Sequence, residues 1–312
     1  MLNVLFLTKM PEKGTLYFKN LPDTNVLFDS PDNLSADQLA SVEAVLGNPS
    51  GELVTKLPNL KWIQLNSAGA NTYSWLPEHI LLTNASGAYG PAISEYMITY
   101  AFAGLKNLMK YHDLQKEESW TDLGKVPMFD RCTVVSLGMG DIGSNFLKRA
   151  KALGAYTVGV RRTAHDKPEY ADELVTYSEL EDILPRADIL GMSLPETAET
   201  TGIMNRNRLS EMKKDSVLIN VGRGSAIVTE DLENLVREGM FRAVFLDVTD
   251  PEPLPEGHPL WKEDRVYITP HITGKFNSET TFENIVDIFL TNLRHYRNHE
   301  PLEHVVNRTL GY

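Results

Sequence analysis

The spacing of three glycines constrains the fold of this chain more than any other feature. An apolar run at 133–137 leads into Gly138, Gly140 and Gly143, arranged as G-x-G-x-x-G, and a helical pattern at 145–153 follows. In such a strand–turn–helix unit the first glycine allows a tight turn, the second lets a diphosphate approach the backbone, and the third lets helix and strand pack closely. Glycines at this spacing also occur in ordinary turns, so the prediction of a dinucleotide site depends on the flanking strand and helix. The residues predicted to surround the diphosphate are Gly138, Met139, Gly140, Asp141, Ile142 and Gly143.

Two arginines follow the next predicted strand, at 156–160. An acidic residue about 20 positions after the glycines would bind the adenosine ribose of NAD, whereas this chain has Arg161, Arg162 and Thr163 there. Arginine can bind a 2′-phosphate through two parallel hydrogen bonds. We therefore predict NADP(H) as the preferred cofactor, with NAD(H) as the alternative. The other interpretation is that both arginines are solvated surface residues.

Apolar runs alternate with helical patterns along the whole chain, which is typical of parallel sheets with helices on their faces. Strands are predicted at 3–8, 44–46, 62–65 and 80–84, and then at 133–137, 156–160, 189–193, 217–221, 243–247 and 266–269. One long helix is predicted over 91–116 and a last helix over 278–297. The six later strands suffice for a doubly wound sheet.

We therefore predict an α/β chain of two Rossmann-like domains, each built on a doubly wound parallel sheet. The predicted substrate (catalytic) domain comprises 1–100 and is completed by 278–312. The predicted dinucleotide-binding domain comprises 101–277 and is inserted into it. A chain of 312 residues is long enough to bury two such cores.

The charge balance restricts the class of ligand. The chain carries 30 Lys and Arg and 42 Asp and Glu, which gives a net charge of −12. This balance argues against nucleic-acid binding, because phosphate neutralisation requires a basic face. A small anionic ligand would need positive groups gathered at its site.

Cysteine usage and hydropathy favour a cytoplasmic protein. Cys132 is the single cysteine, so neither an intramolecular disulfide nor a cysteine-based zinc site is expected, and we predict no metal. Residues 1–8 lack the pattern of a signal peptide. No apolar stretch reaches the roughly 18 residues that a membrane span needs, so no membrane partner is expected.

Three loops carry polar side chains directly after predicted strands. Arg223 lies between two glycines, Glu252 lies in a proline-rich loop, and His271 follows the last strand of the series. Ligands bind outside the carboxyl ends of the strands in doubly wound sheets. An arginine fork for a carboxylate and carbonyl, a proton donor and an anion beside that donor are what 2-keto acid reduction requires.

The chain resembles the D-isomer-specific 2-hydroxyacid dehydrogenases over nearly its whole length. The resemblance depends on the order and spacing of several segments together with the glycine loop. These segments are NASGAYGPAISE at 84–95, LPETAETTG at 194–202, LINVGRG at 218–224, LDV at 246–248 with EPLP at 252–255, HPLW at 258–261 and TPH at 269–271.

The resemblance implies a role for each matching residue. Arg223 would bind the substrate carboxylate and carbonyl oxygen, His271 would protonate that oxygen during reduction, and Glu252 would hold and polarise the imidazole. Asp247 stands where such enzymes often hold the nicotinamide carboxamide. The backbone at Ala68, Gly69 and Ala70 would donate N–H groups to the substrate carboxylate. The dinucleotide groove would be lined by Ser193, Leu194, Pro195 and Val221.

Two positions depart from the family pattern. Thr249 replaces the usual aromatic residue after the Asp-Val pair, which puts the packing of that loop in doubt. Gly274 lacks the side-chain hydroxyl expected three residues after the histidine, which weakens any inference about the substrate substituent.

These observations predict an NAD(P)-dependent oxidoreductase. The expected reaction is NADP(H)-dependent reduction of glyoxylate, hydroxypyruvate or a close analogue to the D-2-hydroxy acid, in a homodimer joined through the cofactor domain. One alternative is a dinucleotide-sensing corepressor on the same fold. Another, an NAD-dependent phosphoglycerate-type dehydrogenase, is disfavoured because the chain stops at Tyr312 without an appended regulatory domain. A formate dehydrogenase is disfavoured because Glu252, and not an amide, is the expected partner of the histidine.

Overall fold

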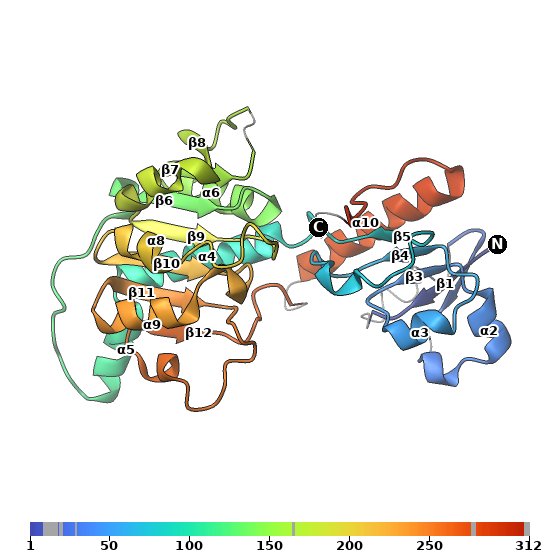
Figure 1. The fold of residues 1–312 in the computed structure, drawn as a ribbon, viewed down its shortest axis with the longest axis horizontal. Coiled ribbons are helices and arrows are strands. Elements are labelled where there is room, and N and C mark those ends of the chain that lie inside the picture. The colour runs from blue at the N-terminus through green and yellow to red at the C-terminus, as the bar shows by residue number, and fades with distance from the viewer. Residues whose placement is uncertain (9–17, 19–20, 29, 164–165, 276–278, 309–312) are drawn as a thin grey trace. The chain divides into compact units, whose positions relative to one another are not determined.

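The computed structural model describes the whole chain except residues 9–17, 19–20, 29, 164–165, 276–278 and 309–312. The chain divides into two compact units: residues 1–88 with 279–312, and residues 89–278. Each unit contains one parallel sheet flanked by helices (Figure 1). The predicted α/β fold, with one unit inserted into the sequence of the other, is confirmed.

The first unit has a five-stranded parallel sheet in the order β2-β1-β3-β4-β5. Its strands are β1 (Leu2–Phe6), β2 (Thr24–Leu27), β3 (Ala44–Leu46), β4 (Trp62–Gln64) and β5 (Leu81–Thr83). Its longer helices are α2 (Ala36–Ser41), α3 (Gly51–Thr55) and α10 (Glu279–Asn298). The strand β2 was not predicted, because it is a short, incompletely buried edge strand without a clear apolar run.

The C-terminal helix belongs to the first unit through both apolar and polar contacts. The indole of Trp62 is fully buried and stacks on Phe289 of α10 with 5.6 Å between ring centroids. The amide nitrogen of buried Asn292 donates to Gln64 Oε1 at 2.9 Å, and the same oxygen accepts from Thr83 at 2.7 Å. A buried and satisfied polar network of this kind fixes α10 on the sheet.

The second unit has a seven-stranded parallel sheet in the order β12-β11-β10-β9-β6-β7-β8. Its strands are β6 (Thr133–Leu137), β7 (Tyr156–Arg161), β8 (Glu173–Thr176), β9 (Ile189–Met192), β10 (Ser216–Asn220), β11 (Phe241–Leu246) and β12 (Val266–Ile268). Its longer helices are α4 (Gly90–Leu105), α5 (Leu108–Lys116), α6 (Asp141–Ala152), α7 (Leu180–Ile183), α8 (Arg206–Glu211) and α9 (Thr229–Arg237). Chain order reverses direction at β6, which places the switch point of the sheet beside the glycine loop.

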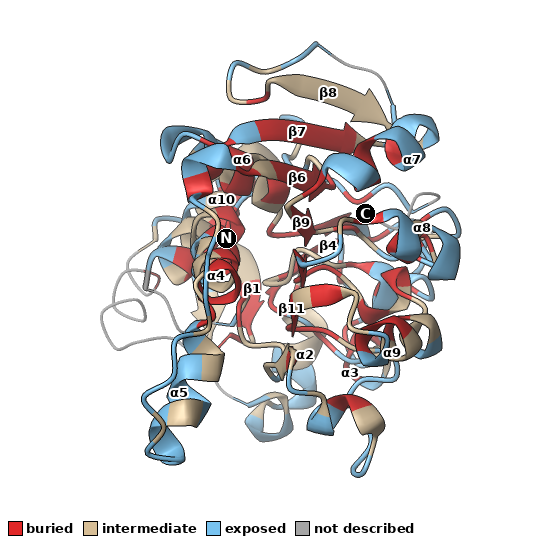
Figure 2. Cartoon of the chain, turned by 90° about the vertical axis from the view of Figure 1, so that its left-hand side faces the viewer, coloured by how far each residue is buried: buried red, intermediate tan, exposed pale blue. Residues whose placement is uncertain are grey.

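Burial follows the layers of this unit. Figure 2 shows β6, β7 and β9 largely in red between helices whose outer faces are pale blue, whereas the edge strand β8 is tan. The six strands predicted for this sheet are confirmed. β8 was missed because all four of its residues are only partly buried, which leaves no apolar run in the sequence.

The single helix predicted over 91–116 was wrong. The structure has α4 and α5 instead, separated where Asn107 takes a left-handed backbone conformation with φ of 54°. Asparagine tolerates this conformation, which stops the regular hydrogen bonding of α4. The division of the chain at residue 88 also differs from the predicted domain boundary at 100, because α4 packs against α6, β10 and β11 of the second unit.

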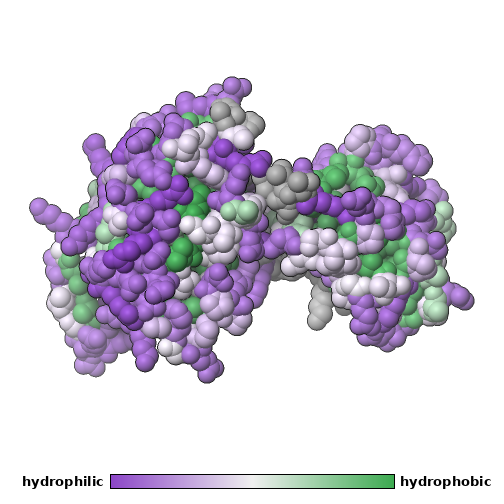
Figure 3. All heavy atoms as spheres, in the orientation of Figure 1, coloured by the Kyte–Doolittle hydropathy of each residue, from purple (hydrophilic) through white to green (hydrophobic). Residues whose placement is uncertain are grey.

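The surface agrees with the polar composition. On the face drawn in Figure 3, hydrophilic residues in purple cover most of the second unit, with smaller hydrophobic patches between them. Within the described residues, no helix combines the length and the hydropathy that a membrane crossing requires.

Candidate active site

The glycine loop joins β6 to α6, and each glycine serves a different steric need. Gly138 has φ of +107°, a conformation that residues with side chains rarely adopt. A Cβ atom on Gly143 would lie 1.8 Å from the carbonyl oxygen of Gly138, so only glycine fits there. A Cβ atom on Gly140 would meet no atom within 4 Å. Gly140 therefore leaves open space beside the N-terminus of α6, where a phosphate group is favoured.

The side chain of Asp141 has another task. Its Oδ2 accepts a hydrogen bond of 2.7 Å from the backbone N–H of Gly90, and its Oδ1 accepts one of 2.9 Å from Asn145. These bonds attach the start of α4 to the first turn of α6. Because both carboxylate oxygens accept these bonds, the predicted contact of Asp141 with the cofactor would come from its backbone N–H.

Arg161 is the last residue of β7, and Arg162 and Thr163 follow it in exposed positions. Arg161 pairs in register with Thr176 at the end of β8. The neighbouring parallel strand β6 ends at the glycine loop. The arginines and the glycine loop therefore lie at the same carboxyl edge of the sheet. Two arginines thus lie at the edge where the adenosine end of a dinucleotide binds in such sheets.

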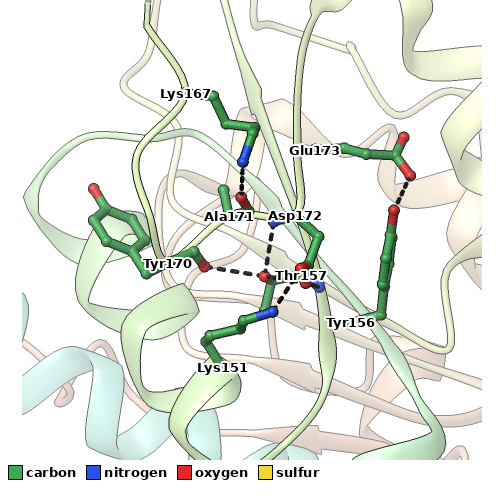
Figure 4. Close-up of polar contacts among 8 residues, drawn as sticks. All are labelled: Lys151, Tyr156, Thr157, Lys167, Tyr170, Ala171, Asp172 and Glu173. Atoms are coloured by element: carbon green, nitrogen blue, oxygen red, sulfur yellow. Dashed lines mark hydrogen bonds and ion pairs between the residues drawn. The ribbon is translucent and has the colours of Figure 1, made fainter.

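The opposite end of β7 is held by the cluster drawn in Figure 4. Asp172 Oδ2 accepts hydrogen bonds from the backbone N–H and the hydroxyl of Thr157 at 2.9 and 3.0 Å, and Asp172 Oδ1 binds Lys151 at 2.5 Å. Next to it, Glu173 accepts from Tyr156 and binds Arg186. These contacts fix the start of β8 against the start of β7, so the segment after Arg161 is anchored where it returns to the sheet.

The same contacts perturb both carboxylates. Burial is the largest single effect and raises the pKa of Asp172, but the hydrogen bonds from Lys151 and Thr157 together lower it by more. The pKa of Asp172 therefore lies below its ordinary value. The hydrogen bond from Arg186 and then that from Tyr156 hold the pKa of Glu173 below its ordinary value. Both side chains are therefore favoured in the ionised form.

The predicted groove residues lie beside the glycine loop. Ser193 follows β9 and approaches the carbonyl oxygen of Gly138 with its hydroxyl at 3.5 Å, and a Cβ on Gly138 would meet the Ser193 carbonyl at 3.0 Å. Leu194 and Val221 are 2% and 5% exposed, respectively, while Pro195 is partly buried. The first two form the apolar base of this edge and expose little surface to a ligand.

Arg223 stands on a loop that the protein fixes by close backbone contacts. Buried Asn220 donates to the Arg223 carbonyl at 2.9 Å and accepts from the Gly222 N–H at 3.1 Å. A Cβ on Gly224 would lie 2.0 Å from the backbone of Thr249, so the Arg223 loop and the loop before Glu252 touch directly. The two predicted catalytic segments therefore form one rigid edge.

The departure at Thr249 does not loosen this loop. The Thr249 hydroxyl donates to the carbonyl oxygen of Pro251 at 2.8 Å. The hydroxyl of Thr229, at the start of α9, donates to the carbonyl of Asp250 at 2.7 Å. Polar contacts thus replace the packing of an aromatic side chain.

Glu252 and His271 form the pair that the sequence predicted. The distance between Glu252 Oε1 and His271 Nδ1 is 2.7 Å, and the side chains are 43% and 45% exposed. With the Nδ1 proton directed at the carboxylate, Nε2 is the nitrogen left to face a ligand. Within the described residues, no protein group hydrogen-bonds to that Nε2. Such a pair can hold and deliver a proton at one defined atom.

Asp247 lies immediately after β11 and is 2% exposed. Its Oδ1 accepts from the Thr269 hydroxyl at 2.7 Å and from the Ile272 N–H at 2.9 Å. Its Oδ2 accepts from the N–H and the hydroxyl of Thr273 at 3.1 and 2.6 Å. All four donors belong to the segment that carries His271. A contact between Asp247 and a nicotinamide stays a prediction.

The sequence analysis missed these threonines and the tyrosine that joins them. The Tyr100 hydroxyl of α4 lies 3.1 Å from Thr269 Oγ1. A hydroxyl on each side of the histidine in TPHIT was the available signal for Thr269 and Thr273, but no local pattern pointed to Tyr100. At Gly274, where a hydroxyl was expected, a Cβ would make a tight contact of 3.2 Å with the terminal methyl group of Ile93 on α4.

The proposed substrate loop lies in the first unit. Ala68 accepts a hydrogen bond on its carbonyl from Asn84 at 2.8 Å, and Gly69 accepts one from the Ser67 hydroxyl at 2.8 Å. With their carbonyls occupied, the backbone N–H groups of Ala68, Gly69 and Ala70 stay predicted donors to a carboxylate. Within the residues that the structure describes, no group of His, Cys, Asp and Glu side chains is arranged for a metal ion.

Comparison with known proteins identifies what the chain is similar to. Residues 98–273 match the family model described as D-isomer specific 2-hydroxyacid dehydrogenase, NAD binding domain. The chain is 31% identical over 240 residues to a glyoxylate/hydroxypyruvate reductase A of Enterobacter sp. (strain 638), covering 76% of this chain and 74% of that protein.

Solved structures agree over nearly the full length. A D-isomer specific 2-hydroxyacid dehydrogenase family protein from Aeromonas salmonicida superposes with a TM-score of 0.88 at 26% identity, covering 98% of this chain and 99% of that one. A probable 2-hydroxyacid dehydrogenase from Rhizobium etli, solved with NADP, HEPES and L(+)-tartaric acid, has a TM-score of 0.81 at 26% identity and covers 100% and 99% of the two chains.

Proposed function

Because the chain belongs to the D-isomer-specific 2-hydroxyacid dehydrogenase family, we propose that it uses NADPH to reduce a small 2-keto acid of the glyoxylate or hydroxypyruvate type to the D-2-hydroxy acid. The family makes the protein an oxidoreductase that uses a nicotinamide dinucleotide. The observation that carries the proposed reaction is the 2.7 Å contact between His271 Nδ1 and Glu252 Oε1. The loop before Glu252 touches the loop of Arg223.

The chain's own residues fit a dinucleotide. Gly140 leaves open space at the start of α6, a helix of 12 residues whose N–H groups favour a diphosphate. Arg161 and Arg162 at the end of β7 can bind a 2′-phosphate by charge-assisted hydrogen bonds, which supports NADP(H) over NAD(H). The solved structure of the Rhizobium etli relative contains NADP, which adds support.

The catalytic groups divide the work. A reduced nicotinamide, when held at this edge, would supply the hydride for the carbonyl carbon. His271, protonated on both ring nitrogens, donates the Nε2 proton to the carbonyl oxygen, so that the carbonyl becomes a hydroxyl and the imidazole becomes neutral. Glu252 keeps the Nδ1 proton in place throughout, and the exposed ring regains its proton from water. Arg223 binds the carboxylate and orients the carbonyl.

The proposed substrate also needs donors from the first unit. We propose that the backbone at Ala68, Gly69 and Ala70 binds the substrate carboxylate. Substitution of Gly69 by proline removes one N–H group and should raise KM for the keto acid much more than KM for NADPH. An equal rise in both constants would argue against this assignment.

The direct test is an assay of NADPH oxidation with a panel of 2-keto acids. We expect turnover with glyoxylate or hydroxypyruvate, and a lower KM for NADPH than for NADH. Absence of turnover with every keto acid, despite NADPH binding, would favour the alternative of a dinucleotide-sensing corepressor. Turnover with NADH alone would contradict the assignment of Arg161 and Arg162.

We further propose a cytoplasmic homodimer, as the family resemblance implies. Exposed hydrophobic side chains gather on α5 and the segment after it, in residues Leu108, Tyr111, Trp120 and Met128. Light scattering coupled to size-exclusion chromatography measures the mass directly. We expect a dimer for the natural chain and a shift toward monomer when Leu108 is replaced by Glu; a monomer for the natural chain contradicts the proposal.

A further inference from the structure

The segment that carries His271 has an unfavourable backbone conformation. His271 has φ of +51°, in the left-handed region that residues with side chains seldom occupy. Its N–H donates to the carbonyls of Asp247 and Thr269, both at 2.9 Å. A strained conformation of this kind persists only where the surroundings over-determine it. The question is which contacts do so.

Asp247 makes most of the contacts that hold the segment carrying His271. An ionised carboxylate offers about four acceptor positions, and the four donors from Thr269, Ile272 and Thr273 account for that number. Asp247 as a whole is 2% exposed, so little of its surface is left for a donor from a ligand. Its geometry therefore suits holding residues 269–273 better than binding the nicotinamide carboxamide.

The network extends to α4 with a defined direction. The Thr269 hydroxyl gives its single proton to Asp247 Oδ1, so in the 3.1 Å contact with Tyr100 the tyrosine hydroxyl must be the donor. Burial, the largest cause, raises the pKa of Tyr100, which keeps that donor proton in place. The Tyr100 ring is fixed by stacking on Phe245 of β11, with 4.9 Å between centroids and 10° between planes.

We infer that Tyr100, Thr269, Thr273 and Asp247 form a positioning network that holds the imidazole of His271 for proton transfer. The network acts on His271 through the backbone of 269–273. This inference rests on the proposed function, because it assumes that His271 is the proton donor. It adds a set of residues, on α4 and in the loops that follow β11 and β12, that the reaction depends on without contacting the reacting atoms.

The first test replaces Thr269 by Val, which keeps the shape of the side chain and removes the hydroxyl. We expect kcat for glyoxylate or hydroxypyruvate to fall about tenfold, the factor that about 1.4 kcal/mol corresponds to, with the Kd of NADPH unchanged. Thr269→Ser should restore most of the rate. Tyr100→Phe should give a smaller loss, whereas Tyr96→Phe, on the same helix, should give none.

A double-mutant cycle separates positioning from general stability. In a His271→Asn background, Thr269→Val should cause no further loss, because there is no imidazole left to orient. The same tenfold loss in both backgrounds, or no loss in either, would overturn the inference. If His271→Asn alone leaves turnover unchanged, the proposed role of His271 fails, and the network with it.

A second measurement does not depend on turnover. Diethyl pyrocarbonate modifies exposed imidazoles, and mass spectrometry follows each histidine separately. We expect Thr269→Val to change the modification rate of His271 and to leave that of His258 unchanged. Identical rates at His271 in the natural chain and the variant would contradict the inference even if no substrate were found.

Discussion

A partly exposed aspartate and a buried one hold loops at opposite edges of the seven-stranded sheet, and they do so with different partners. Asp172 precedes β8 at the amino edge and uses Lys151 together with Thr157. Asp247 follows β11 at the carboxyl edge and uses hydroxyl and backbone N–H donors alone. Among the described residues, no lysine or arginine binds Asp247. The aspartate therefore brings no second positive charge into the segment that carries His271. At the amino edge, which carries none of the predicted catalytic residues, an ion pair with Lys151 holds the aspartate.

The largest expected effect tests the catalytic edge directly. Replacing His271 by Asn keeps a polar side chain of similar size but removes the transferable proton. We expect kcat of keto acid reduction to fall by about a thousandfold, as for loss of a general acid, with the Kd of NADPH nearly unchanged in a fluorescence titration. His258→Asn is the matched control, because His258 caps the short helix at Pro259–Lys262 and lies 3.9 Å from Glu233, away from the His271–Glu252 pair. Unchanged turnover would remove His271 from the mechanism.

Replacing each aspartate by Ala compares the two hubs as structural elements. Asp247→Ala leaves several buried donors without an acceptor, so the free energy of unfolding should fall by about 3 kcal/mol. Asp172→Ala breaks a partly exposed cluster and should lower it by about 1 kcal/mol. Urea denaturation of both variants measures the difference. Equal losses would show that burial of the carboxylate does not distinguish the two edges.

The next effect concerns the two ends of β7. Replacing Arg161 and Arg162 together by Ser should raise KM for NADPH about tenfold, because charge-assisted hydrogen bonds to a 2′-phosphate are lost. KM for NADH should change little. The control is Arg186→Ser, which removes a guanidinium bound to Glu173 at the amino edge. A parallel rise in both Michaelis constants would mean that the arginines do not read the phosphate.

The smallest effect is a dependence of stability on pH at the amino edge. The pKa of Asp172 and that of Glu173 are lowered in the folded protein. Their stabilisation is therefore fully present above the unfolded-state values of about 4 and is lost as the pH falls through the lower folded-state values. We expect Asp172→Asn to be less stable than the natural chain at pH 7 and to lose less stability on acidification below pH ~4. Urea midpoints at several pH values measure this, and parallel curves would contradict it.

Several elements followed from local sequence. The glycine spacing, the apolar strand before it and the loops with Arg223, Glu252 and His271 each depend on neighbouring residues, and each was predicted. The edge strands β2 and β8 were missed because partly buried strands lack a continuous apolar run. The long helix was mispredicted because a left-handed Asn107 interrupts an otherwise helical pattern.

The sequence by itself determined the α/β class, the glycine loop and the residue types on which the proposed reaction rests, because these depend on local steric needs and on the carboxyl ends of successive strands. Only the tertiary structure decided that Glu252 lies 2.7 Å from His271, and that Tyr100, far away in the chain, joins Thr269 and Asp247. Hydrogen bonds between separate elements leave no periodic pattern in a sequence. They form only when packing has brought α4 against β11, because that packing places each donor beside its acceptor.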